Sequence, residues 1–146
     1  MAGQSGQADG RGARVTEGTL LHRQVHPSWV QQGRVTSQVF RPTPKDKKKL
    51  SVYDGDKITA DKAWEHFTTV LMFPSVGVLA VTVAECKSLQ LTPAPDPEAF
   101  PEHALIDFTP HAENQIVKKS KLLKACAETR GWQYQAGAEP HLTATP

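Results

Sequence analysis

The chain has 146 residues, which fits one compact domain, because a single hydrophobic core commonly takes about 100–200 residues. Its 38% hydrophobic and 22% charged residues exclude a collagen, a coiled coil and a wholly disordered chain. Seventeen Lys and Arg residues against fifteen Asp and Glu residues leave a formal charge of +2. That excess is too small to predict a nucleic-acid partner, because phosphate binding depends on many basic contacts.

No stretch of the sequence approaches the roughly 20 apolar residues that a membrane-spanning helix needs. The first residues also lack the basic and apolar regions of a secretory signal, so we expect a cytoplasmic protein with no membrane partner. His22 and His26 have the spacing of two ligands on a helix, but on a strand they would lie roughly 13 Å apart at about 3.3 Å per residue. The sequence therefore predicts neither a metal site nor a cofactor.

Taken in chain order, the sequence predicts one α+β domain over residues 18–134. Residues 1–17 are rich in glycine, glutamine and serine and cannot bury enough apolar surface to fold, so they predict a flexible tail. A second flexible tail is expected over residues 135–146, where a small and polar segment ends the chain.

The first half of this domain shows strand patterns. Residues 18–25 predict a strand that ends before Pro27, because proline restricts the residue that precedes it. Alternating apolar side chains predict two more strands over residues 34–40 and 50–53. The lysine-rich residues 41–49 between them predict an exposed loop.

A helix is expected to begin at Thr59, which can serve as its N-cap. Its apolar residues recur at helical spacing and are Ala60, Ala63, Trp64, Phe67 and Leu71. We expect Trp64 and Phe67 to anchor this helix in the core. Residues 76–83 then predict a buried central strand, since they are short, β-branched and preceded by a turn signal.

The last third predicts a short helix over residues 84–90, a strand over 103–108 and a long helix over 112–130 that ends at Gly131. Strand runs interrupted by two clear helices favour the α+β class over a regular βαβ repeat. The expected architecture is a small domain in which a mixed or antiparallel sheet packs against two main helices.

Four short motifs stand in order along the chain: His26-Pro27-Ser28-Trp29, Ser37 followed by Phe40, Leu50-Ser51-Val52 and His103-Ala104-Leu105-Ile106. Together they resemble a recurrent family of short uncharacterised bacterial proteins. That resemblance covers roughly residues 20–125 and implies no activity that can be carried over to this chain.

The polar members of these motifs are the candidate site residues His26, Ser37, Ser51 and His103. They form a site if the strands that carry them are neighbours and their side chains converge. Alternatively they are only turn and core signatures, because polar residues within strands have both explanations. Both interpretations stay open at the level of sequence.

Two classes of function fit these observations. The first is a non-enzymatic interaction or accessory protein of the bacterial cytosol with a protein partner, set in a defence or conflict operon, since the sequence carries no complete catalytic constellation. The second is a small enzyme that acts on a nucleotide-like substrate, by analogy with ADP-ribosyltransferase-like folds. In that case His22 or Arg23, Ser51, Tyr53 and Glu102 would surround the ligand.

Overall fold

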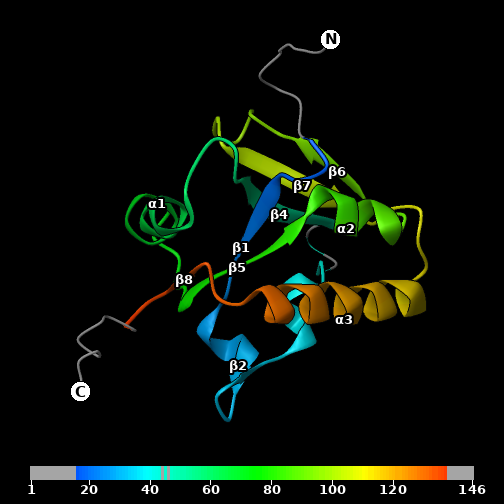
Figure 1. Cartoon of the computed structure of the whole chain (residues 1–146), viewed down its shortest axis with the longest axis horizontal. Coiled ribbons are helices and arrows are strands. Elements are labelled where there is room, and N and C mark those ends of the chain that lie inside the picture. The colour runs from blue at the N-terminus through cyan, green and yellow to red at the C-terminus, as the bar shows by residue number, and fades with distance from the viewer. Residues whose placement is uncertain (1–15, 44, 46, 138–146) are drawn as a thin grey trace.

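The computed structural model describes residues 16–43, 45 and 47–137, which form an α+β domain (Figure 1). Its six-stranded sheet is antiparallel throughout, in the order β6-β7-β4-β1-β5-β8. The strands are β1 (Leu20–Gln24), β4 (Lys49–Asp54), β5 (Gly77–Thr82), β6 (Thr92–Pro95), β7 (His103–Asp107) and β8 (Tyr134–Gln135). The fold class that the sequence predicts is thereby confirmed.

Helices and a small hairpin complete the domain. The helical segments are η1 (Pro27–Trp29), η2 (Ser37–Phe40), α1 (Ala60–Glu65), the π-helical η4 (His66–Val70), α2 (Val83–Ser88) and α3 (Glu113–Arg130). A second sheet pairs only β2 (Val30–Gln31) with β3 (Arg34–Val35). Gln32 and Gly33 both have positive φ between these two strands, the geometry of a tight hairpin turn.

The main core lies between one face of the large sheet and the segments α2, α3 and η2. Leu79 and Val81 of β5 belong to this core together with Ile116 and Leu123 of α3. Side chains alternate along a strand, so Val78 and Ala80 face the opposite side of the sheet. In Figure 1, α1 and α3 lie on opposite sides of β1 and β5. The sheet is therefore covered by helices on both faces.

Two helix ends are fixed by local sequence. Thr82 and Glu85 form a reciprocal capping box at the start of α2. Gly131 has φ of +93° directly after α3, a backbone conformation that glycine adopts without strain. Arg130 in the last turn of α3 also binds the carboxylate of Glu85 at 2.7 Å, which joins the ends of α2 and α3.

The prediction of one strand over residues 34–40 is wrong. The strand stops after Val35, and Ser37–Phe40 is a 3-10 turn instead. Val39 and Phe40 are both fully buried in the core. A strand would send these neighbouring side chains to opposite faces, whereas the turn packs both on the same side.

The helix after Thr59 forms, but the expectation that Trp64 and Phe67 anchor it in the core is wrong. Both side chains are half-buried, and Ala63 is the fully buried residue of α1. Trp64 lies against Tyr134 with 5.1 Å between ring centroids. The helical spacing thus identifies the inner face correctly, but that face is only partly covered.

Residues beside both predicted boundaries of the domain make backbone hydrogen bonds within the fold. Glu17 accepts a backbone hydrogen bond from Ala84, and Gln135 pairs with Gly77 in the sheet. Residues 1–15 and 138–146 of the two predicted tails lie outside the described residues. Within the described part of the chain, no helix has the length and apolar character to cross a membrane.

Candidate functional site

The large sheet opens between β1 and β4, and a cavity lies at this opening. These two strands pair only at Leu21 with Asp54 and at His22 with Tyr53. Beyond that point Arg23 bridges the gap: its Nη1 donates to the Ser51 carbonyl at 2.8 Å and its Nε to the Val39 carbonyl at 2.7 Å. The guanidinium thus takes the place of ladder hydrogen bonds between the strands.

The cavity has a volume of about 210 Å³ and combines polar and aromatic walls. Its lining comes from β1, β4, the segment from η4 to Phe73, and the chain around β7. The lining residues are His22, Arg23, Gln24, Ser51, Val52, Tyr53, Phe67, Leu71, Phe73, Phe100 and His103. Among them no carboxylate occurs, and Arg23 carries a permanent positive charge.

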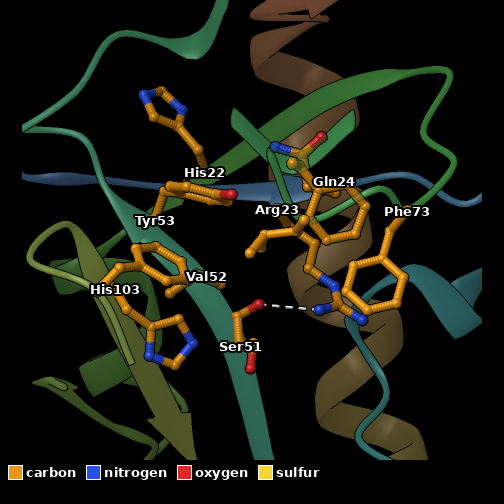
Figure 2. Close-up of a pocket in the computed structure, with 11 residues that line it drawn as sticks. His22, Arg23, Gln24, Ser51, Val52, Tyr53, Phe73 and His103 are labelled. Carbon is orange, nitrogen blue, oxygen red and sulfur yellow. Dashed lines mark hydrogen bonds between the residues drawn. The ribbon is translucent and has the colours of Figure 1, made fainter. Parts of the chain in front are cut away.

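Arg23, Ser51 and His103 form the polar corner of the cavity (Figure 2). Tyr53 lies opposite His103 in the β4–β7 ladder, and Ser51 is two residues from Tyr53 and so faces the same side of the sheet. His103 Nδ1 lies 2.9 Å from Asp96 Oδ2. Strand pairing therefore brings a hydroxyl and an imidazole to the same cavity.

Aromatic rings form the rest of the wall. Phe67 and Phe73 lie with 5.4 Å between ring centroids. Phe100 lies 5.1 Å from the Tyr53 ring and 5.0 Å from the His103 ring. Such spacing leaves flat apolar faces beside the polar corner, and a planar ring of a ligand could stack against them.

Tyr53 is held by a second histidine. Its hydroxyl lies 2.8 Å from His66 Nδ1, and the two rings meet edge to face. Burial, together with the charge of Glu102, raises the pKa of the Tyr53 phenol well above its usual range. Tyr53 therefore stays protonated at neutral pH and is suited to donate a hydrogen bond rather than to act as a base.

His22 borders the cavity but does not belong to its polar corner. In Figure 2 its imidazole extends away from Ser51 and His103. The side chain is 4% exposed, and its Nδ1 has no hydrogen-bond partner in the described structure. Desolvation lowers the pKa of His22 to about 4. At neutral pH this histidine is uncharged and contributes to packing.

Of the four candidate residues, the structure brings Ser51 and His103 together, whereas His26 and Ser37 lie elsewhere. His26 precedes η1, where its Nδ1 accepts from the Ser28 amide at 3.0 Å. Ser37 opens η2. Neither residue lines the cavity: His26 is the N-cap of η1 and Ser37 is the first residue of η2.

Among the residues of the enzyme hypothesis, Arg23, Ser51 and Tyr53 line the cavity together, but Glu102 does not. Its carbonyl accepts from the Asp54 amide at 2.8 Å. Within the described residues, no group of three His, Cys, Asp or Glu side chains is placed to hold a metal ion.

Sequence reasoning missed Asp96, Phe73 and Phe100. Asp96 stands between two prolines, and Phe73 and Phe100 each stand directly before a proline, in segments without periodicity. The one available signal was the alternation of polar with apolar residues in 50–53, which places Ser51 and Tyr53 on one face.

No protein-family model, curated protein or solved structure matches this chain. The resemblance to the family of short bacterial proteins therefore stays a prediction. The site has to be interpreted from its own geometry.

Proposed function

We propose that this protein is a small enzyme that binds a nucleotide-like molecule in the cavity between β1 and β4. The observation that carries the proposal is that flat aromatic walls and a polar corner share this cavity. A nucleotide offers the matching pair of features, because a planar base is joined through a sugar to a phosphate.

The size of the cavity supports binding of one ring system. Pockets that enclose a whole drug-sized ligand measure about 300–1,000 Å³, whereas this cavity measures about 210 Å³. A base would fill the aromatic part, the sugar would lie at the polar corner, and the phosphate would extend from that corner over the rim.

The charge of the cavity supports an anionic ligand. Arg23 lies at the polar corner, and its planar guanidinium suits recognition of phosphate oxygens. The guanidinium is held by two backbone carbonyls and lies over the Trp29 ring, 5.0 Å from its centroid. A cation fixed in this way is already oriented before a ligand arrives.

The analogy with ADP-ribosyltransferase-like folds supports the substrate class and not one particular reaction. Arg23, Ser51 and Tyr53 line the cavity together, which supports the analogy, but the downstream acid Glu102 lies outside the cavity lining. We therefore propose a nucleotide-like substrate and leave the transferred group unspecified.

Calorimetric titration with AMP tests the proposal. Phe73 is 54% exposed and Leu122 on α3 is 51% exposed, so both can be truncated at similar cost to stability. We expect Phe73→Ala to weaken AMP binding by up to about tenfold, since a ring contact contributes roughly 0.5–1.5 kcal/mol. Leu122→Ala should bind like the unmodified chain. No binding at millimolar AMP, or equal loss in both variants, would contradict the proposal.

We propose an accessory protein with a protein partner as the second candidate, and an exposed apolar segment favours it. Val70, Met72 and Phe73 are 64%, 75% and 54% exposed beside the cavity. Contiguous apolar surface of this kind often marks an interaction site. A partner recovered from the native host should be lost with Met72→Ser and kept with Leu122→Ser. Equal recovery by both variants would contradict this candidate.

A further inference from the structure

We propose that His103 is the acid–base group of the cavity and that Asp96 is the residue that positions it. This inference rests on the proposed function and adds two roles to it. Asp96 does not line the cavity and acts only through the imidazole.

Asp96 is joined to His103 through both side chain and backbone. Its Oδ2 lies 2.9 Å from His103 Nδ1, and its amide donates to the His103 carbonyl at 2.8 Å. The imidazole also meets the Phe100 ring edge to face at 5.0 Å. Because the His103 side chain is only 10% exposed, these contacts fix the orientation of the ring.

This orientation determines which nitrogen is available to a ligand. A carboxylate at Nδ1 favours the tautomer that carries its proton there, so the lone pair of Nε2 is free. In Figure 2 one ring nitrogen of His103 is directed toward Ser51 across the polar corner. Within the described residues, Nε2 has no hydrogen-bond partner, and we assign this atom as the proton acceptor.

The step that follows is a proton transfer from a ligand hydroxyl. With a base against Phe67 and Phe73, the sugar of a nucleotide would reach the polar corner. The O–H bond breaks as the N–H bond at His103 Nε2 forms, and the electron pair of the broken bond stays on the ligand oxygen. The positive charge of the imidazolium is balanced by Asp96, and in the reverse step the imidazolium returns the proton to that oxygen.

A purely structural role is the competing explanation, since the same contacts hold the segment between Asp96 and His103 against the sheet. The tautomer of His103 separates the two explanations. Nitrogen-15 NMR of the full chain reports which ring nitrogen carries the proton, and it needs neither ligand nor activity.

We expect the Nδ1-protonated tautomer in the unmodified chain. Asp96→Ala should lower its population, because Nδ1 then keeps only the longer contact of 3.3 Å to the backbone carbonyl of residue 96. Asp96→Asn should restore it, because the amide oxygen still accepts from Nδ1. The matched control is Asp107→Ala, since Asp107 lies on the same strand and accepts from the Thr109 amide at 2.8 Å. It should leave the tautomer unchanged. An Nε2-protonated ring in the unmodified chain, or the same tautomer in all variants, overturns the inference.

A second arm tests the proton acceptor. AMP should shift the His103 Nε2 signal, whereas AMP that lacks both ribose hydroxyls should bind without this shift. Equal shifts with both ligands overturn the acid–base role. If AMP does not bind but the tautomer depends on Asp96, the proposed function and the acid–base role fail while the positioning role of Asp96 stands.

Discussion

Acidification is expected to destabilise the fold through His22, and His22→Leu should remove this sensitivity. His22 is buried opposite Tyr53, and its Nδ1 has no partner in the described structure. The folded protein therefore holds the neutral imidazole, while the unfolded chain accepts a proton readily. Leucine has a similar volume and carries no group that titrates.

The magnitude follows from the shift in pKa. A fall from 6.5 to about 4 corresponds to about 3 kcal/mol, at about 1.4 kcal/mol for each pKa unit. Since the folded-state pKa is the lower one, the unfolded state binds more protons between these values, and stability falls as the pH falls. The contribution is complete above pH 6.5 and is lost progressively down to about pH 4. About 2 kcal/mol should be lost by pH 5.

Urea unfolding of the unmodified chain and of His22→Leu, each at pH 7.5 and pH 5, measures this effect. Burial raises the pKa of Asp54, which acts in the opposite direction in acid. Asp54 is present in both chains, so its effect cancels when the pH dependence of one is subtracted from that of the other. We expect the unmodified chain to lose about 2 kcal/mol more than His22→Leu. An equal loss in the two chains would refute the reasoning.

Two further predictions compare matched positions. Phe108 is fully buried, so Phe108→Ala should cost about 3–5 kcal/mol in urea unfolding. Phe67→Ala should cost less than about 2 kcal/mol, because its half-buried ring borders a cavity; equal costs would contradict this assignment. A Cβ at Gly55 would lie 2.5 Å from the Leu20 carbonyl oxygen, whereas a Cβ at Gly18 meets nothing within 4 Å. Gly55→Ala should therefore lower the melting temperature by several degrees and Gly18→Ala by almost none, and equal effects would contradict the predicted clash.

Sequence patterns predict those helices and strands that pack along their whole length against the core. The helix over α3 was predictable because its buried residues recur at helical spacing, and the strand over β5 because it is a short, continuous apolar run rich in β-branched residues. The same rule fails at Val39, where the alternation is accidental and burial of both Val39 and Phe40 favours a turn. It also misses β6, since Pro93 and Pro95 argue against a strand in the interior of a sheet.

The site was only half predictable, because it depends on pairing between distant segments. Ser51 and His103 meet through the β4–β7 ladder, and no local pattern specifies which strands become neighbours. Asp96 reaches His103 because the chain reverses between β6 and β7. The motifs of His26 and Ser37 resembled those of Ser51 and His103 in form, yet they specify turns.

The two prolines of β6 also limit how this domain can associate with others. In an antiparallel strand, the N–H and C=O groups of one residue point to the same side of the strand, and those of the next residue point to the other side. Pro93 and Pro95 alternate with Thr92 and Ala94, whose amides can bond β7, so the prolines occupy the positions that face outward. An incoming strand would find carbonyl acceptors there but no N–H donors. Fibril-like stacking and recruitment by β-augmentation are both disfavoured along β6, and assembly there has to rely on side chains.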